Sequence, residues 1–143
     1  AVTIAGMGGS LIRDILEAGK LNQRLSGQER LILQPNIGER TLRSWLQENQ
    51  YKIQSEKILE ENKQIYEIIV AEKEQKPVTY NEMELMFGPF LLEEKSEIFK
   101  SKWTRELQQR KAIREQLKQA ANQEARQKQI EQEIQMIEEV LKT

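Results

Sequence analysis

Hydrophobic positions in the first 24 residues change from an extended pattern to a helical one. Residues 2–5 form a short β-type run, and three glycines around a methionine follow at positions 6–9. An amphipathic helix is predicted next by apolar residues at helical spacing, namely Leu11, Ile12, Ile15 and Leu16. We expect Ser10 to be the N-cap of this helix and Gly19 to end it.

Apolar and polar positions then predict a strand, a helix and two further strands. The continuous apolar run 31–33 predicts a strand that is buried on both faces, and Pro35 begins the turn that ends it. A helix follows Gly38, with an apolar face of Leu42, Trp45 and Leu46. Strands near 53–59 and at 64–73 flank the polar turn "EENK" and predict a closing hairpin.

This order of elements predicts an α/β fold. Strands that alternate with helices imply right-handed crossovers and a parallel sheet. Ligands of such sheets bind at the carboxyl ends of the strands. The two unusual loops, "GMGG" at 6–9 and "QPN" at 34–36, both fall at such ends. We therefore expect them to form one site.

After residue 75 the pattern becomes helical. Residues 77–91 contain two prolines and a glycine and predict a connector with one short helix around 81–87. From about Leu92 to Ala121 there is no glycine or proline, which predicts one uninterrupted helix. Residues 120–123 offer a break, and the second helix that follows carries a heptad seam of Ile130, Ile134, Ile137 and Leu141. An antiparallel helical hairpin buries both stripes; one long helix that dimerises is the alternative.

Composition limits the chemistry that the chain can perform. The 143 residues contain no cysteine and no histidine. This excludes disulfides, a Ser-His-Asp triad, a histidine general base and nearly every zinc site. No apolar run approaches the roughly 18 residues of a membrane span. Chemistry must therefore depend on backbone dipoles, amides, carboxylates or a bound cofactor.

Charge is distributed unevenly along the chain, although the net charge is only −1. Residues 100–128 carry nine Lys or Arg against three Glu, a net charge of +6. Residues 129–143 carry one Lys against four Glu, a net charge of −3. Few acidic groups lie close in sequence to offset the basic stretch. It is either a contact for a polyanion or the solvated face of a charged helix.

The "GMGG" loop has two interpretations. A glycine-rich loop between a strand and a helix lets backbone N–H groups approach a ligand, with the helix N-terminus adding positive potential. The loop lacks both the GxGxxG spacing and the lysine of a Walker loop, and a turn that needs positive φ is the plain alternative. In "QPN", Gln34 and Asn36 offer amide hydrogen bonds. We expect Trp45 and Trp103 to be packing residues.

Several of these stretches resemble one known family. "TIAGMGGSLIRDIL", "LILQPN", "LRSWLQENQYKIQSEKILEENKQIYEIIVAEK", "FGPFL" and "KW" are similar in order and spacing to bacterial TrmK. This is a family of tRNA (adenine-N1)-methyltransferases that use S-adenosylmethionine. The resemblance extends from residue 2 to about residue 105.

The resemblance implies the C-terminal half of a class I, Rossmann-like methyltransferase sheet followed by a helical hairpin of coiled-coil type. Residues 1–76 would supply strands four to seven, 77–91 the connector and 92–143 the hairpin. The strands that carry the glycine-rich S-adenosylmethionine loop and its acidic partner have no counterpart here. We therefore expect the 143-residue chain alone to be inactive and without affinity for the cofactor.

The resemblance also implies a site and a mechanism. N1 of adenine has an in-plane lone pair and needs no base, so catalysis consists of positioning, desolvation and hydrogen bonds. The expected catalytic residues are Gly6, Met7, Gly8, Gly9, Gln34, Pro35 and Asn36. The expected cofactor contacts are Ala5, Gly6 and Met7. The expected tRNA contacts are Lys100, Lys102, Arg105, Arg110, Lys111, Arg114 and Lys118.

Partners and location follow from the same resemblance. A cytoplasmic enzyme is expected that uses S-adenosylmethionine, acts on a D-arm adenine of tRNA, and needs neither metal nor membrane. Self-association through the coiled coil is compatible with the seam. Two alternatives remain open at this point: a non-enzymatic scaffold whose coiled coil binds a protein, and a methyltransferase for another substrate.

Overall fold

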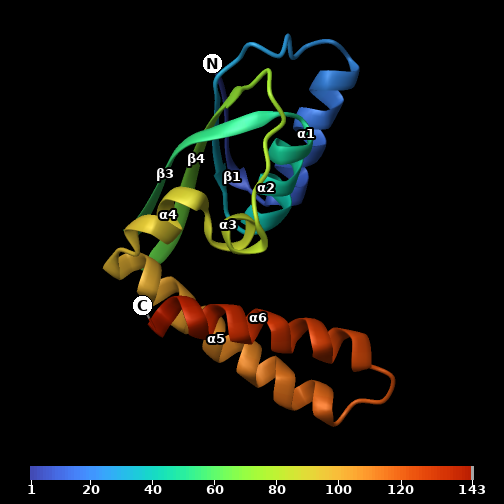
Figure 1. Ribbon diagram of the computed structural model, residues 1–143, viewed down its shortest axis with the longest axis vertical. Helices are drawn as coiled ribbons and strands as arrows, with labels where there is room; N and C mark the ends of the chain where they lie inside the picture. Colours follow the sequence, from blue (N-terminus) through green and yellow to red (C-terminus); the bar gives the residue numbers. More distant parts are fainter. Residues whose placement is uncertain (143) are drawn as a thin grey trace. The chain divides into compact units, whose positions relative to one another are not determined.

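The computed structural model describes residues 1–142 as two compact units, one of Ala1–Glu94 and one that begins at Lys95 (Figure 1). The elements of the first unit are β1 (Val2–Met7), α1 (Gly9–Leu21), β2 (Leu31–Pro35), α2 (Glu39–Glu48), β3 (Tyr51–Glu61), β4 (Gln64–Lys73), α3 (Glu82–Phe87) and α4 (Pro89–Glu94). The predicted order is confirmed from β1 to α3, whereas α4 was not predicted.

The first unit is built on one four-stranded sheet in the order β1-β2-β4-β3. β1 and β2 are parallel, as a crossover through α1 requires, whereas β4 is antiparallel to both of its neighbours. The prediction of a parallel sheet therefore holds only for the β1–β2 pair. The closing hairpin makes the sheet mixed, because a short turn can join only antiparallel strands.

The core of this unit lies between the sheet and the helices α1 and α2. Ile12 and Leu16 of α1 and Leu42 of α2 pack against Leu31 and Leu33 of β2, and all five are buried. Ile32 is only half-buried, so the prediction that this strand is buried on both faces was wrong. Successive side chains of a strand point to opposite faces, and Ile32 lies on the face away from this core.

Helix α1 begins and ends at residues other than those predicted. Its N-cap is Gly8, without a side-chain hydrogen bond, and Ser10 is already inside the first turn. The shift arises because the Gly9 N–H donates to the Ile37 carbonyl at 2.6 Å, which fixes the start of the helix. Gly19 does not end the helix but lies in its last turn, where a Cβ would be 3.2 Å from Leu25 Cγ.

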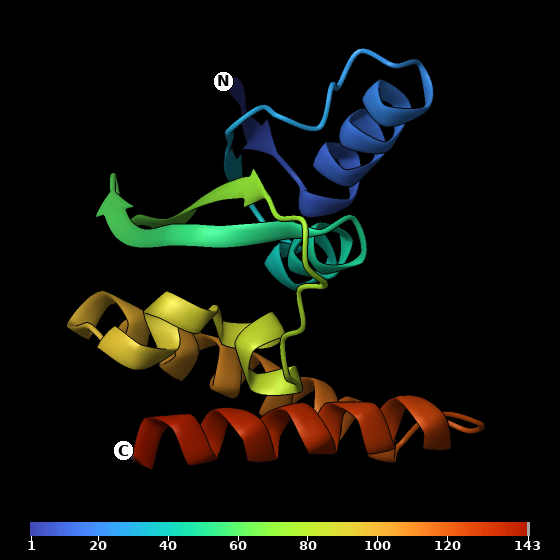
Figure 2. The same ribbon diagram turned by 45° about the horizontal axis from the view of Figure 1, so that its top comes forward.

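The β3–β4 hairpin extends to the edge of the sheet where β1 and β2 end. Its turn consists of Asn62 and Lys63, both with positive φ (52° and 64°). Leu33 of β2 pairs with Ile69 of β4, so the residues of β4 before Ile69 run alongside the chain that leaves β2. Figure 2 shows the hairpin continuing past α2 to this tip.

A charged cluster lies in the interior of the first unit and was not predicted. Arg43 of α2 forms ion pairs with Glu56 of β3 (2.8 Å) and Glu67 of β4 (2.7 Å), and none of the three side chains is more than 1% exposed. Burial lowers the pKa of Arg43, but the two carboxylates raise it by more, so the net shift is upward. The arginine therefore remains charged inside the protein.

The same cluster holds the connector between β4 and the end of the unit. The Arg43 guanidinium donates to the carbonyls of Leu85 (3.3 Å) and Met86 (3.4 Å), and Glu56 accepts from the Phe90 N–H (2.9 Å). Gly88 has φ +93°, and a Cβ there would lie 2.6 Å from both Arg43 Nη2 and Glu56 Oε1. The chain thus passes directly over the charges at a residue without a side chain.

The second unit consists of α5 (Glu97–Lys118) and α6 (Glu124–Lys142), which lie side by side and antiparallel (Figure 1). Leu117 near the end of α5 packs with Ile130 and Ile134 of α6. Of the predicted seam, Ile130, Ile134 and Ile137 are buried, but Val140 is buried in place of Leu141, which is half-buried. The helical face therefore turns slightly along α6, as expected for 3.6 residues per turn.

The prediction of one uninterrupted helix from Leu92 to Ala121 was wrong. α4 ends at Glu94, and Lys95 has a φ of +46°, which no α-helix accommodates. Ser96 then caps α5, because its hydroxyl oxygen accepts from the Phe99 N–H at 3.3 Å. The break between α5 and α6 lies at residues 119–123, where the sequence predicted it.

Candidate functional site

Three hydrogen bonds lie at the carboxyl edge of the sheet, two between the ends of β1 and β2 and one within the "QPN" turn. The Gly6 N–H donates to Gln34 Oε1 at 2.8 Å, and Gln34 Nε2 donates to Asn36 Oδ1 at 3.2 Å. The Asn36 N–H in turn donates to the Met7 carbonyl at 2.9 Å. The residues of "GMGG" and "QPN" that sequence reasoning placed in one site therefore lie in contact.

These bonds fix the orientation of both amides. Gln34 Oε1 faces Gly6, so its Nε2 faces Asn36 and makes a second, longer bond to the Pro35 carbonyl (3.3 Å). Asn36 Oδ1 accepts from Gln34, which makes Asn36 Nδ2 the donor that points away from this pair. Within residues 1–142, Nδ2 takes part in none of the hydrogen bonds, and Asn36 is exposed. The loop therefore presents one oriented N–H donor group.

The three glycines of the loop have different environments. Gly6 has φ +78° at a bulge of β1, and a Cβ there would meet nothing within 4 Å. A Cβ on Gly8 would make only an ordinary contact, 3.8 Å from Ile37 Cγ1. On Gly9 it would lie 2.1 Å from the Gly38 carbonyl oxygen. Gly6 leaves its backbone open to a ligand, whereas Gly9 is required for packing of the two loops.

A cavity of about 530 Å³ opens at this edge, within the ~300–1,000 Å³ range of small-molecule sites. One wall is polar and is formed by Gly6, Gln34 and Asn36. The other wall comes from the β3–β4 hairpin, and its residues are Leu59, Glu61, Asn62, Tyr66 and Ile68. A planar ligand could thus meet amides at its edge and apolar side chains at its face.

Other expected site residues do not line this cavity. Ala5 pairs with Gln34 in the strand ladder, and Met7 pairs with Pro35 and packs against the core. Pro35 is buried, so it shapes the turn between the two amides rather than contacting a ligand. Gly8 and Gly9 form the start of α1.

Sequence reasoning missed the hairpin wall. The hairpin itself was predicted, but its residues were treated as structural. Leu59 and Tyr66 are cross-strand partners, so they share a face of the sheet, and Ile68 lies two residues further along that face. The alternation of Tyr66 and Ile68 with the buried Glu67 and Ile69 was the available signal, because it marks a second half-apolar face of β4.

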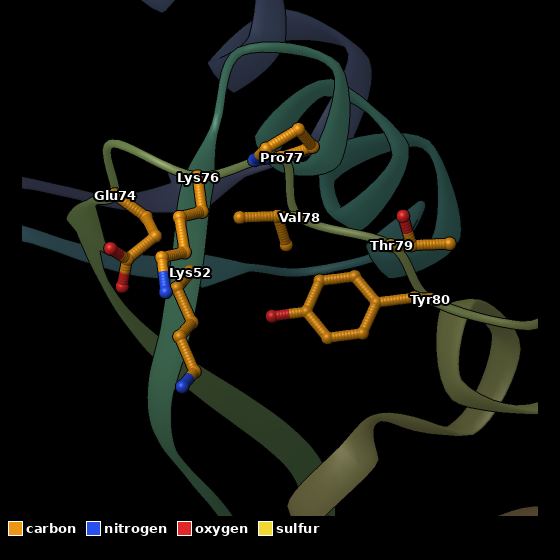
Figure 3. A pocket seen from close by; sticks show the side chains of 7 residues that line it. All are labelled: Lys52, Glu74, Lys76, Pro77, Val78, Thr79 and Tyr80. Atoms are coloured by element: carbon orange, nitrogen blue, oxygen red, sulfur yellow. The ribbon is translucent and has the colours of Figure 1, made fainter.

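A second cavity of about 450 Å³ lies between β3 and the connector (Figure 3). Its lining residues are Lys52, Glu74, Lys76, Pro77, Val78, Thr79 and Tyr80. The Tyr80 hydroxyl points toward Lys52 in Figure 3 and accepts from the Ile53 N–H at 2.9 Å. Burial raises the pKa of Tyr80. This cavity lies where β3 begins and β4 ends, at the edge opposite the carboxyl ends of β1 and β2, and it lacks their oriented amides.

The basic residues of α5 have acidic neighbours that α6 contributes. Arg110 pairs with Glu133 at 3.1 Å and also with Glu106 of its own helix, while Arg114 pairs with Glu131 at 3.3 Å. Lys111 lies 3.8 Å from Glu138. Acidic groups that are distant in sequence therefore offset part of this charge, because the antiparallel α6 places its glutamates beside α5.

Lys100, Lys102 and Lys118 instead have partners on α5 itself. Lys100 pairs with Glu97 at 3.5 Å and Lys118 with Glu115 at 3.1 Å, both within the helix. The Lys102 amino group lies 5.0 Å from the centre of the Trp103 ring. Trp103 also packs against Phe99, with ring centres 6.3 Å apart, as expected for a packing residue.

The described residues, 1–142, contain neither a metal-binding cluster nor a helix suited to cross a membrane. Among residues 1–142, no group of three or more Asp or Glu side chains is arranged to hold a metal ion. No helix in that part of the chain combines the length and the apolar character that crossing a bilayer requires.

Comparison with known proteins gives consistent matches. A family model described as "TrmK: tRNA (adenine(22)-N(1))-methyltransferase" matches residues 1–139. The tRNA (adenine(22)-N(1))-methyltransferase of Bacillus subtilis (strain 168) is 49% identical over 128 residues, which are 87% of this chain and 53% of that protein.

Solved structures match nearly the whole chain. The crystal structure of the B. subtilis m1A22 tRNA methyltransferase TrmK superposes with a TM-score of 0.87 and 42% identity, covering 97% of this chain and 62% of that one. Streptococcus pneumoniae Sp1610 in complex with S-adenosyl-L-methionine gives a TM-score of 0.81 and 40% identity, covering 97% and 58%. The chain thus spans a little over half the length of the relatives that it matches.

Proposed function

The chain belongs to the TrmK family of tRNA (adenine(22)-N(1))-methyltransferases, and we propose that it forms the substrate side of an enzyme that methylates N1 of a tRNA adenine. One observation carries the proposal: Gly6, Gln34 and Asn36 meet in a cavity at the carboxyl ends of the parallel strands. This is where ligands of such sheets bind.

The residues at the end of β1 fit a cofactor that approaches the backbone closely. Gly6 is exposed, and the space that a Cβ would occupy there is empty. We propose that Ala5, Gly6 and Met7 contact S-adenosylmethionine, the ligand named for the S. pneumoniae relative. When bound, this cofactor supplies a methyl group on a positively charged sulfur.

The proposed reaction requires little acid–base chemistry from the protein. The N1 lone pair of adenine forms the new bond to carbon while the methyl–sulfur bond breaks and the sulfur keeps the bonding pair. No proton has to be removed first, which fits a site without histidine. Gln34 and Asn36 would orient the base, and the remaining site residues would shape the loops that exclude water.

We further propose that the helical pair α5–α6 is a coiled coil that contacts tRNA through phosphates. The expected contacts do not contribute equally. Arg110 and Arg114 bridge to α6 and are only 21% and 27% exposed, so they hold the helices together as well. The more exposed Lys100, Lys111 and Lys118 are better placed to reach phosphates. Lys102 and Arg105 complete the proposed set.

Location and assembly remain predictions. Because tRNA is the proposed substrate, we place the enzyme in the cytoplasm. Self-association through the helical pair would use residues outside the cavity, so it is independent of the proposed reaction.

The test is methylation of tRNA by the intact protein that contains these residues. With S-adenosylmethionine and unmodified tRNA, we expect 1-methyladenosine in digests analysed by mass spectrometry. Gln34→Ala should lower turnover about 10-fold to 100-fold, because Gly6 and Asn36 both lose the partner that positions them. Gln28→Ala, the same change at an exposed loop residue, should leave turnover unchanged.

Two results would contradict the proposal. One is a protein that binds S-adenosylmethionine but forms no methylated adenine in any tRNA. The other is normal turnover in Gln34→Ala, which would show that the joined loops serve only the fold.

A further inference from the structure

The hairpin wall of the cavity has an aromatic ring at its centre. Tyr66 lies on β4 with Ile68 two residues away on the same face, and Leu59 is its direct partner on β3. All three are half-buried, so each side chain keeps part of its surface open. A face of three partly open apolar side chains next to oriented amides fits a flat, partly polar ligand.

The ring of Tyr66 is held in position from one end. Its hydroxyl donates to Gln64 Oε1 at 2.6 Å, and Gln64 lies on the same strand face. The hydrogen bond therefore restrains the ring without using its π surface. Its polar end is satisfied, and the face stays available for stacking.

The opposite wall limits how such a ligand could lie. Asn36 Nδ2 is the donor that the Gln34–Asn36 bond turns outward, so it would bond an acceptor on the ligand's edge. Adenine carries such acceptors at N3 and N7, which leaves the N1 lone pair free to react, and every base has a flat π surface. A base that has left its stack would then meet Asn36 at its edge and Tyr66 at its face.

We propose that Tyr66 is the stacking platform for the flipped target base and that Asn36, oriented by Gln34, binds the edge of that base. This inference rests on the proposed function, and it adds the hairpin as the part of the chain that holds the nucleotide. Enzymes that modify bases commonly hold the extruded base between apolar or aromatic side chains. Tyr66 is a positioning residue here, because the reaction itself occurs at N1.

The test removes the aromatic ring of Tyr66 and leaves the other residues of the cavity unchanged. In the intact protein, Tyr66→Leu should raise the KM for tRNA roughly 5-fold to 150-fold, the range that base–aromatic stacking gives. The affinity for S-adenosylmethionine and the melting temperature should stay near those of the parent. Tyr66→Phe keeps the ring and loses only the bond to Gln64, so its KM should lie within about threefold of the parent.

A spectroscopic measurement separates stacking from a structural role. The tRNA carries 2-aminopurine at the target position. Its fluorescence is weak while the base is stacked in the RNA, strong when the base is extruded into solvent, and weak again when the base stacks on an aromatic ring. We expect weak fluorescence with the parent and with Tyr66→Phe but strong fluorescence with Tyr66→Leu. Should Tyr66→Leu not fold, Tyr66→Val takes its place, since a β-branched residue suits the strand.

The outcomes are distinguishable from those of the proposed function. One result separates the two proposals: the parent makes 1-methyladenosine, and Tyr66→Leu matches it in KM and in fluorescence. The stacking role of Tyr66 is then overturned, and the proposed methyltransferase function is supported. If the parent makes no 1-methyladenosine, both the methyltransferase function and the stacking role of Tyr66 are contradicted. If Tyr66→Phe loses as much as Tyr66→Leu, the hydroxyl rather than the ring matters, and the stacking role is overturned.

Discussion

The first unit contains two polar regions that are built in opposite ways. In the buried cluster, Arg43 bonds two carboxylates and two carbonyls, and Glu56 also accepts from the connector. At the carboxyl edge, Gln34 and Asn36 bond each other and the backbone on one side and face a cavity on the other. Polar groups that are hydrogen-bonded on all sides serve the fold, whereas polar groups that are hydrogen-bonded on one side only can still bind a ligand.

The difference follows from the cost of removing polar groups from water. A buried charge must find partners for every bond that it gives up, or the fold loses several kcal/mol. An amide at an open edge has no such requirement, because water can complete its bonds until a ligand does. The number of hydrogen bonds that each polar group makes within the protein therefore distinguishes the structural region from the candidate binding region better than the residue types do.

Arg43→Met should have the largest effect on folding. It removes the cation between Glu56 and Glu67 and leaves two carboxylates buried, so we expect a loss of about 3–5 kcal/mol in the free energy of unfolding. Arg40→Met is the matched control on the same helix: its pair with Glu82 is exposed, and we expect a loss of at most about 1 kcal/mol. Urea unfolding measures both. Equal losses would show that the cluster is not structural.

Gly9→Ala should come next, and it tests how closely the two loops of the carboxyl edge pack together. The new Cβ would collide with the Gly38 carbonyl, so the loops after β1 and β2 must move apart at a cost of about 1–3 kcal/mol. Gly8→Ala adds the same atom at a position with room, and its cost should stay near 0.5 kcal/mol. Thermal unfolding of the two variants is the measurement. A Gly9→Ala protein as stable as Gly8→Ala would contradict the close packing of the loops.

Protonation of Glu29 should have the smallest effect on stability, because the hydrogen bonds of its carboxylate form at the surface. Its carboxylate accepts from the Ser26 N–H (2.6 Å) and the Gly27 N–H (3.0 Å), which lower its pKa to about 2. A pKa lowered by folding gives stability that is complete above about pH 4.5 and is lost as the pH falls toward 2. NMR titration of the Glu29 side chain measures the value. Titration near pH 4.5 would mean that the loop does not hold the carboxylate.

The predictable part of the fold came from periodicity. Strand and helix order, the β3–β4 hairpin and the break before α6 all follow from local apolar spacing and turn residues. The errors lie where a distant contact decides the local structure. Ser10 has the chemistry of a cap, but the bond from Gly9 to Ile37, in another loop, sets the start of α1.

The buried charges show a second limit of the sequence. Glu67 continues the alternation of Ile69 and Ala71 toward the core, so its burial was visible, but its partner Arg43 lies 24 residues away. The candidate site shows the same limit. The two loops could be paired by the rule for parallel strands, whereas Tyr66 reaches the cavity only through the register of a hairpin. Pairing across elements is not encoded in local spacing.

The way the connector crosses the cluster at Gly88 has a consequence for how this unit unfolds. Arg43, Glu56, Glu67 and the segment around Gly88 come from four separate parts of the chain. Lifting the connector alone would take the Phe90 N–H from Glu56 and the carbonyls of Leu85 and Met86 from Arg43, and would uncover the side of the cluster that Gly88 covers. Because Arg43 and Glu56 also join α2 to the sheet, we expect the connector and the sheet to exchange their amide hydrogens as one cooperative unit.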